Sequence, residues 1–418
     1  MDLSSPMKIR SFCPARITRC GVLFGFVLAA LLVSRSEAWE VSTHRAMGRY
    51  SGAKLIFAAT NANQDLIPIA GANVLRNPTY WNVIEDYLEL EDQPPNPVQH
   101  FFNPLSNAGL TVGIFPFDHT FRSAADRADD FWGVATTEYR LGNFQTAFSA
   151  LGRVCHLIQD MGCPAHTLND AHPDQSLCSP FEPYLDISCS DFVVRTDSLH
   201  FYATTAANQV HSLDATMSTG TTIRQIMIDL ATRSSQWDSD KACGYGPPGK
   251  GSGSLNNLSC PDFSWPNVDI AQADLGRIVA DCLPATEQAM ARALVIFFAT
   301  VRPQKPTLTQ PEEAKTYSGI AGVPLRVEVN PLAGVSNLRS VRIEFRDNES
   351  LLPNQWHLIR EVNIVGNTVV DERWFNTVHS GQIKLRAVVV DTAGCESIPA
   401  LVNIKIDSTP PKILNTRP

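Results

Sequence analysis

Apolar residues recur at helical spacing over most of residues 39–301. The pattern is clearest where apolar positions follow one another three or four residues apart: Phe144, Ala147, Phe148, Leu151, Val154, Cys155 and Ile158. This spacing predicts a helix with one face in the core. Residues 271–300 predict one or two further buried helices, with Pro284 as an interruption or a first-turn residue. Residues 39–301 are therefore expected to form an all-α domain.

The pattern changes from helical to alternating after Val301. Three prolines between Val301 and Pro311 indicate a linker, which we place at residues 302–312. Beyond it, four runs alternate apolar and polar residues, as half-buried strands do. Their apolar positions are Leu325, Val327 and Val329; Val341, Ile343 and Phe345; Ile383, Leu385, Ala387 and Val389; and Val402, Ile404 and Ile406. Residues 313–418 therefore predict a small all-β sandwich, and their run VVVDTAG resembles the late strand and turn of bacterial immunoglobulin-like or fibronectin-like domains.

Residues 1–38 have the pattern of a secretory signal peptide. Basic residues precede an apolar run from Gly21 to Val33, and Ser36-Glu37-Ala38 matches a small-x-small cleavage site. The run is 13 residues long, whereas a membrane-spanning helix needs about 20. A retained membrane anchor is the alternative. We expect cleavage after Ala38, a mature chain that begins at Trp39, and a secreted or extracytoplasmic location.

Removal of the signal makes the chain more acidic. Five basic and two acidic residues leave with it, so 29 Lys and Arg face 40 Asp and Glu, and the formal charge falls from −8 to −11. The overall charge therefore does not indicate a polyanion-binding surface, although a local metal cluster could bind a phosphate ester. Eight of the ten cysteines remain in an oxidising setting, so disulfides are expected. Cys243 and Cys260 could close the Gly- and Pro-rich segment between them.

Histidines cluster in one short stretch, HLIQDMGCPAHTLNDAH, which holds His156, Asp160, His166 and His172. His156 and Asp160 are four residues apart and project from one face of the predicted helix. Pro164 is expected to end that helix, so that His166 can turn back toward them. Imidazole nitrogens with carboxylate oxygens suit zinc, and a carboxylate between histidines can bridge two ions. The alternative is a capping histidine beside a surface aspartate.

The stretch FQTAFSALGRVCHLIQDMGCPAHTLND resembles the core helix of the zinc-dependent phospholipase C family, with its His-x3-Asp-x5-His spacing. This resemblance implies that the α-amine and carbonyl of Trp39 chelate one zinc beside His44. The spacing Trp39-x4-His44 is closer to that of the related fungal zinc nucleases, which are specific for single strands. Without the resemblance, Trp39 would be a chance residue after the signal and His44 an ordinary surface histidine.

Two further elements extend the resemblance. In DYLELEDQPPNPVQHFFNP, Asp86 and His100 are similar to a pair of metal ligands in the phospholipase branch, and Tyr87 also matches. The family's final His-x3-Glu pair departs from its pattern here, because Cys178 stands in the place of the histidine before Glu182. His172 is the expected substitute, and Cys178 as a thiolate ligand is the alternative.

The resemblance therefore implies three zinc ions and a metal-activated water that attacks a phosphodiester directly. Asp86 is expected to orient or deprotonate this water and Tyr87 to line the pocket. The expected ligands are His100, His156 and Asp86 for one ion, Trp39 and His44 for a second, and His166, His172 and Glu182 for a third, with Asp160 as the bridge.

The expected function is a phospholipase C that acts on a phospholipid or membrane surface and releases diacylglycerol and a phosphorylated head group. A single-strand nuclease-like phosphodiesterase is the first alternative, which the acidic charge of the chain disfavours. A non-catalytic surface-binding protein is the second. The β domain is expected to place the enzyme on a surface, and its partner is unknown.

Overall fold

The computed structural model describes most of both predicted domains. The described residues are 44–45, 47–49, 51–52, 55, 71–91, 99–114, 117–168, 221–237, 272–347, 355–376 and 378–408. The predicted signal peptide, Trp39, His172 and Glu182 lie outside them. Within these ranges, no helix combines the length and the apolar character that crossing a bilayer requires.

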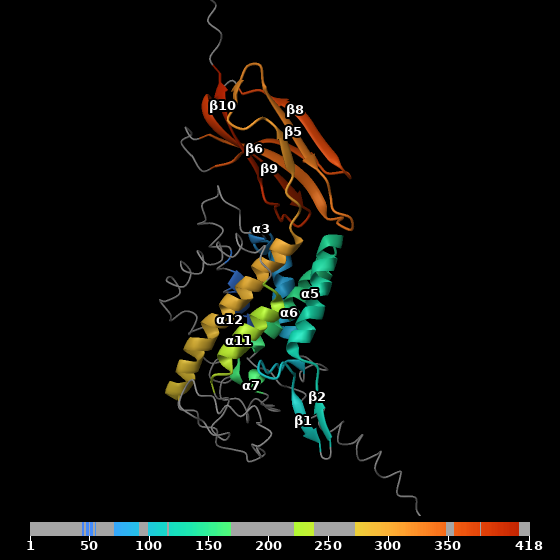
Figure 1. Cartoon of the computed structure of the whole chain (residues 1–418), viewed down its shortest axis with the longest axis vertical. Coiled ribbons are helices and arrows are strands. Elements are labelled where there is room, and N and C mark those ends of the chain that lie inside the picture. The colour runs from blue at the N-terminus through green and yellow to red at the C-terminus, as the bar shows by residue number, and fades with distance from the viewer. Residues whose placement is uncertain are drawn as a thin grey trace, which may run out of the picture.

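Helices form the first domain and strands the second, as Figure 1 shows. The helices run largely alongside one another, and a short β1–β2 hairpin projects from the end of the bundle that is far from the β domain. The elements of this domain are α3 (Ala72–Leu75), α4 (Pro78–Leu90), β1 (Thr111–Ile114), β2 (Phe117–Thr120), α5 (Ala124–Leu141), α6 (Phe144–Asp160), α7 (Pro164–Thr167), α11 (Ile223–Ser234) and α12 (Gln272–Val301).

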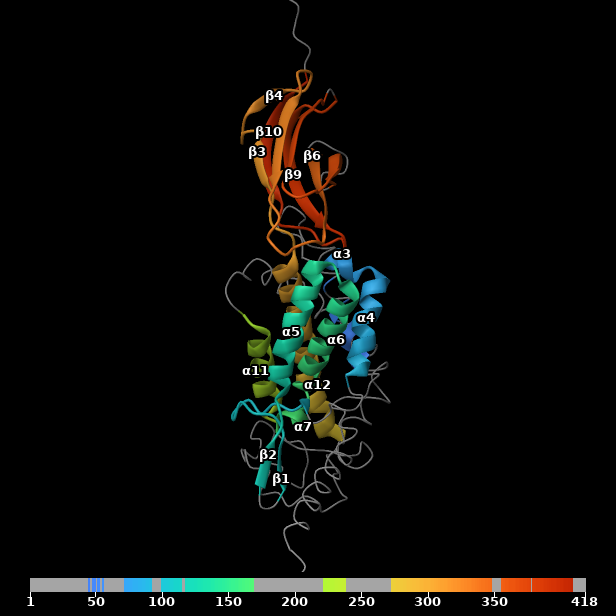
Figure 2. The ribbon, with the colours of Figure 1, turned by 90° about the vertical axis from the view of Figure 1, so that its right-hand side faces the viewer.

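Helix α6 is the centre of the bundle, with α4 and α5 beside it (Figure 2). All the apolar positions that predicted this helix lie within it. All of them except Phe144 are buried. The helix follows α5 after a tight turn in which Gly142 has a φ of 84°. Glycine adopts this left-handed conformation without a steric penalty. The turn therefore sets α5 and α6 antiparallel.

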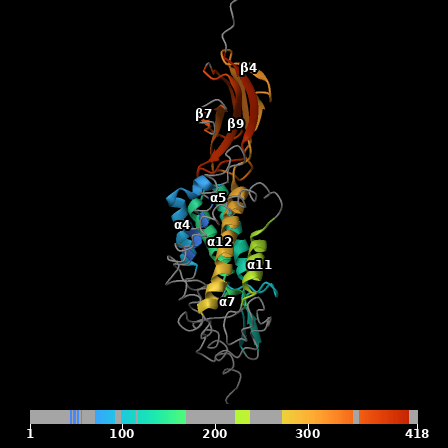
Figure 3. The ribbon, with the colours of Figure 1, turned by 90° about the vertical axis from the view of Figure 1, so that its left-hand side faces the viewer.

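The last helix, α12, continues through Pro284 as one helix from Gln272 to Val301. It runs the length of the bundle in Figure 3. The expected interruption at Pro284 is therefore wrong. A proline within a helix removes one backbone hydrogen bond and costs about 3 kcal/mol. Buried residues that follow it, among them Met290, Leu294 and Phe297, pack into the main core and offset this cost.

The β domain consists of two sheets around one apolar core. Its strands are β3 (Thr307–Gln310), β4 (Thr316–Ser318), β5 (Val323–Val329), β6 (Leu338–Asp347), β7 (His357–Asn363), β8 (Thr368–Trp374), β9 (Gly381–Asp391) and β10 (Ala400–Asp407). Five form a sheet in the order β4-β10-β9-β6-β7 and three a sheet in the order β3-β5-β8. The four alternating runs lie in β5, β6, β9 and β10, whose inward residues form the shared core. The immunoglobulin-like assignment stays a prediction.

The predicted linker at 302–312 is partly wrong, because β3 lies inside it and pairs with β5. Prolines at its two ends, Pro303 and Pro311, flank a strand at the edge of its sheet, where a proline removes no central ladder bond. Only residues 302–306 connect α12 to the β domain without helix or strand.

The two domains share a buried interface at the N-terminal end of α6. The Tyr139 hydroxyl donates a hydrogen bond to Asp391 Oδ2 at 2.8 Å, and Asn337 Nδ2 donates to the Tyr139 carbonyl at 3.0 Å. Ala393 and Cys395 of the β domain belong to the same apolar cluster as the helices. The domains therefore pack as one body through a continuous core.

Four of the cysteines expected to form disulfides are buried thiols instead: Cys155, Cys163, Cys282 and Cys395. Burial raises the pKa of Cys155 to about 12. These side chains fill the core as small apolar groups do. Disulfides among Cys178, Cys189, Cys243 and Cys260 stay a prediction, because these residues lie outside the described ranges.

We predict that Gly152→Ala lowers the free energy of unfolding by about 1–3 kcal/mol. A Cβ at Gly152 would lie 2.7 Å from the Ile84 carbonyl oxygen and 2.8 Å from Tyr87 Cβ, so α4 would have to move away from α6. Gly133→Ala is the control, since its Cβ would meet nothing within 4 Å and should stabilise α5 by roughly 0.5–1 kcal/mol. Urea denaturation measures both. Equal stabilisation by the two substitutions would contradict the close approach of α4 to α6.

We also predict that Asp391→Asn flattens the pH dependence of stability between pH 4.5 and 7.5. Burial raises the pKa of Asp391 to about 6, against hydrogen bonds from Tyr139 and three backbone N–H groups that lower it. The folded state therefore holds this proton more tightly than the unfolded state. The resulting stabilisation is full below pH about 4 and is lost as the pH rises through about 6, a change of up to about 3 kcal/mol.

Urea titrations at several pH values measure this effect. Asp371→Asn is the control, because the Asp371 side chain is 63% exposed and lies in the same domain. That variant should keep the wild-type profile. Identical profiles for Asp391→Asn and the wild type would contradict the prediction.

Candidate metal centre

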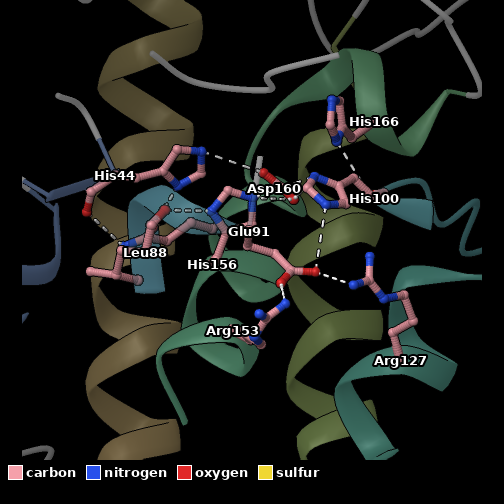
Figure 4. A network of polar contacts seen from close by, with 10 residues as sticks. His44, Leu88, Glu91, His100, Arg127, Arg153, His156, Asp160 and His166 are labelled. Atoms are coloured by element: carbon pink, nitrogen blue, oxygen red, sulfur yellow. Dashed lines mark hydrogen bonds and ion pairs between the residues drawn. The ribbon is translucent and has the colours of Figure 1, made fainter. Parts of the chain in front are cut away.

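The C-terminal end of α6 carries a buried carboxylate surrounded by histidines (Figure 4). Asp160 is the last residue of the helix and His156 lies one turn before it. His44 comes from a helical segment near the start of the described chain, and His100 from the segment between α4 and β1. All four side chains are fully buried.

Backbone hydrogen bonds hold the His100 segment in place. Phe102 N donates to the His166 carbonyl at 3.0 Å, and Ala124 N donates to the Phe101 carbonyl at 3.0 Å. The His166 ring stacks on Phe101 with centroids 4.4 Å apart. Residues 100–102 are thereby fixed between α5 and α7, which places His100 and His166 at the end of α6.

The nitrogen and oxygen atoms of the cluster have the separations expected of metal ligands. His156 Nε2 and His100 Nδ1 each lie 3.2 Å from Asp160 Oδ2 and 3.4 Å from each other. His44 Nε2 lies 3.6 Å from the other oxygen, Asp160 Oδ1. Two ligand atoms about 2.1 Å from a tetrahedral zinc ion are about 3.4 Å apart. The residues therefore fit a metal on each side of the carboxylate, and His44, His156 and Asp160 alone could hold one.

Three of the histidines are oriented by neutral oxygen acceptors. His156 Nδ1 lies 2.7 Å from the Leu88 carbonyl oxygen, His44 Nδ1 lies 2.6 Å from Gln159 Oε1, and His166 Nδ1 lies 3.1 Å from the His100 carbonyl oxygen. A carbonyl oxygen cannot donate, so each Nδ1 carries the hydrogen. Each Nε2 then has a lone pair to offer a metal.

The carboxylate is ionised and lacks donors. Burial acts to raise the pKa of Asp160, but positive charge on His156 and His100, when these rings are protonated, holds it well below its usual range. Within the described part of the chain, neither oxygen of Asp160 accepts a hydrogen bond. A buried carboxylate in that condition costs several kcal/mol unless it is paired with a cation. The donor set thus fits one or two dications that bind between the carboxylate and the histidine rings.

The structure places Asp86 and Tyr87 away from this cluster. The Asp86 side chain is 57% exposed and pairs with Arg45 Nη2 at 2.9 Å. The Tyr87 ring lies under the guanidinium of Arg153, at 5.1 Å from its centroid. The structure therefore does not bring Asp86, the expected ligand, or Tyr87, the expected pocket residue, to the cluster, because successive residues of α4 point in different directions and these two face outward or toward α6.

Glu91 is the acidic residue of this region that does reach the cluster. Its side chain is fully buried, and Oε1 lies 3.8 Å from His100 Nε2. The run DYLELED is acidic, but nothing in the sequence distinguishes Glu91 from its acidic neighbours. Trp39, His172 and Glu182 lie outside the described residues, so their roles as ligands stay predictions.

Comparisons with known proteins add only weak likenesses. No protein-family model matches the chain, and no curated protein matches it. Among solved structures, it is similar to the alpha toxin of Clostridium absonum, at 10% identity and a TM-score of 0.34 over 86% of this chain and 98% of that chain. The alpha-toxin of Clostridium perfringens strain SWCP matches over the same shares at 10% identity and a TM-score of 0.32.

A superoxide reductase (neelaredoxin) from Ignicoccus hospitalis matches 25% of this chain and 82% of its own, at 13% identity and a TM-score of 0.18. Likenesses with such TM-scores transfer neither a fold nor an activity to this chain. Evidence about function therefore comes from the geometry of the cluster itself.

We predict that Asp160→Asn lowers the zinc content of the purified protein by at least one ion per chain, whereas Asp86→Asn leaves it unchanged. The amide removes the negative charge that faces three histidines, while Asp86 is engaged by Arg45 at the surface. Elemental analysis after dialysis against excess zinc and then metal-free buffer measures both. Loss of zinc in Asp86→Asn but not in Asp160→Asn would reverse the assignment.

Proposed function

We propose that this protein is a zinc-dependent phosphodiesterase, most simply a phospholipase C. The observation that carries the proposal is the buried group of His44, His100, His156 and Asp160, with ligand separations of 3.2–3.6 Å. Imidazole nitrogens with a carboxylate oxygen are the donor set of catalytic zinc sites, and a tetrahedral arrangement matches zinc.

The proposal assigns described residues to two of the three ions. His100 Nδ1, His156 Nε2 and Asp160 Oδ2 would hold one, and His44 Nε2 with Asp160 Oδ1 would hold the second. Asp160 would thus contribute to both sites. The α-amine of Trp39 would complete the second site, while His166, His172 and Glu182 would hold the third.

Zinc in such sites lowers the pKa of water toward about 7 and polarises phosphoryl oxygens as a Lewis acid. The chain's own contribution is to place and orient the ligands. Leu88 and Gln159 fix the rings of His156 and His44, and Phe101 supports the ring of His166. This rigid burial keeps the ligands in position before a substrate binds, so that little reorganisation is needed.

The choice of a phospholipid over a nucleic acid rests on the sequence resemblance and on charge. The stretch 144–170 and the His-Phe-Phe-Asn-Pro run that begins at His100 resemble the phospholipase branch, and the net charge of −11 after removal of the proposed signal disfavours a long polyanion. A nuclease-like phosphodiesterase is the alternative, supported by the Trp39-x4-His44 spacing. A non-catalytic binding protein would leave the buried ligand set without a role.

The β domain is proposed to place the enzyme on a surface in a secreted or extracytoplasmic setting. Its interface with the helices lies at Tyr139, near the start of α6, whereas the cluster lies at the end of that helix. An α-helix rises about 1.5 Å per residue, so the 17 residues of α6 separate the two by roughly the length of the helix. The described interface with the β domain therefore lies far from the cluster.

We predict zinc-dependent release of phosphocholine from phosphatidylcholine vesicles, with at least a hundredfold loss of turnover in His156→Ala. That variant removes a ligand from the site that offers the closest-spaced donors. Release of phosphocholine and cleavage of single-stranded DNA are assayed in parallel. His119→Ala, which replaces an exposed histidine, is the control. Cleavage of DNA alone would replace the phospholipase proposal with the nuclease. A zinc-loaded protein without activity on either substrate would contradict the proposal that this protein is an enzyme.

A further inference from the structure

The ring of His100 is oriented differently from the rings of the other three histidines. His44, His156 and His166 direct Nδ1 toward neutral oxygens and leave Nε2 for a metal. His100 is turned the other way, since its Nδ1 lies 3.2 Å from Asp160 Oδ2 and its Nε2 faces Glu91. The acceptor behind His100 is therefore a carboxylate instead of an amide or backbone carbonyl.

We propose that Glu91 is a positioning residue that fixes His100 as a metal ligand through Nδ1. This inference rests on the proposed zinc site. Glu91 Oε1 lies 3.8 Å from His100 Nε2, which is longer than a hydrogen bond but close enough for a carboxylate to favour the tautomer with hydrogen on Nε2. That tautomer leaves the Nδ1 lone pair directed at the metal position beside Asp160.

The end of α4 brings both orienting groups to the site. Glu91 is the C-cap residue of this helix, and Leu88 is one of its last residues. The last four carbonyl oxygens of a helix have no partner within it. The Leu88 carbonyl is therefore available to accept from His156 Nδ1, while Glu91, less than one turn later, faces His100. One helix end thus orients two ligands of the same proposed ion.

Two arginines hold Glu91 in its ionised form. Arg153 Nη1 of α6 donates a hydrogen bond to Glu91 Oε2, and Arg127 Nη2 of α5 forms an ion pair with Oε1. Both guanidinium groups also lie 5.3 Å from the Phe131 ring centroid.

Arg127 and Arg153 hold Glu91 in place, a role that a search for metal-ligand motifs in the sequence would miss. Glu91 is buried among groups from three helices, so its carboxylate cannot rotate away from His100 without leaving a guanidinium unpaired. Breaking a buried ion pair in that way is strongly unfavourable, because it leaves a charge without its partner. The carboxylate is consequently held in one orientation. The packing of α4, α5 and α6 therefore sets its position relative to the ring of His100.

The test is Glu91→Gln in the full chain, compared with the wild type. The two arginines would compete for the single amide oxygen, and the amide NH₂ would then face His100 Nε2 and disfavour a hydrogen there. We expect the affinity for one zinc ion to fall about 10–100-fold. Competition with a chromophoric chelator measures that affinity, and the visible spectrum of the Co²⁺-substituted protein reports a change in the ligand sphere.

Glu85→Gln is the matched control. Glu85 is also buried on α4, where it accepts from Arg49 Nε at 2.9 Å and from Trp81 Nε1, and it contacts none of the four histidines in the described residues. Glu85→Gln should lower thermal stability but leave zinc affinity and the Co²⁺ spectrum unchanged. A parallel loss of zinc in both variants would show a merely structural effect and overturn the inference, as would unchanged affinity in Glu91→Gln.

If Glu91→Gln fails to fold because two buried guanidinium groups face one amide, Glu91→Gln/Arg127→Gln removes one of those charges. The double variant should fold and still show the loss of zinc affinity. A wild-type protein that binds no zinc would contradict the proposed function instead. In that case, ¹⁵N NMR of the metal-free protein still decides the role of Glu91: a hydrogen on His100 Nε2 that Glu91→Gln displaces supports it, and an unchanged tautomer overturns it.

Discussion

The structure depends on keeping one ionised carboxylate, that of Asp160, inside the protein with no hydrogen-bond donor among the described residues. A charge in that position is stable only where cations or strong dipoles surround it. The chain meets this requirement with rings from three separate segments, at His44, His100 and His156. Helix packing in the first domain brings these segments together, and the group of His44, His156 and Asp160 could hold a metal ion that balances the charge.

Helix α6 joins the two halves of the molecule. Its first turns lie next to the interface with the β domain, where Tyr139 and Asp391 form a buried hydrogen bond. Its last turn carries His156 and Asp160. The close approach of α4 at Gly152 fixes the distance between these helices, so the carbonyl of Leu88 and the carboxylate of Glu91 reach the histidine rings. The candidate metal site and the interface with the β domain therefore lie at opposite ends of one helix.

Two sets of charged residues surround the site and differ in kind. Asp86 and Arg45 form an exposed pair, which contributes little to stability and does not contact the histidines. Glu91, Arg127 and Arg153 form an ion-pair group that costs desolvation. The proposed role of Glu91 in orienting His100 gives this group a function beside the proposed zinc site.

Sequence alone determined the helical and strand halves, the α6 helix, and the pairing of His156 with Asp160, because periodicity and an i, i+4 spacing act within one element. It also singled out His44 and His100, through a resemblance and not through local rules. Only the tertiary structure decided that α12 passes through Pro284, that Asp86 faces solvent, and that Glu91 lies behind His100. These outcomes depend on which face of each helix meets its neighbours, and that choice is made by packing between segments far apart in the chain.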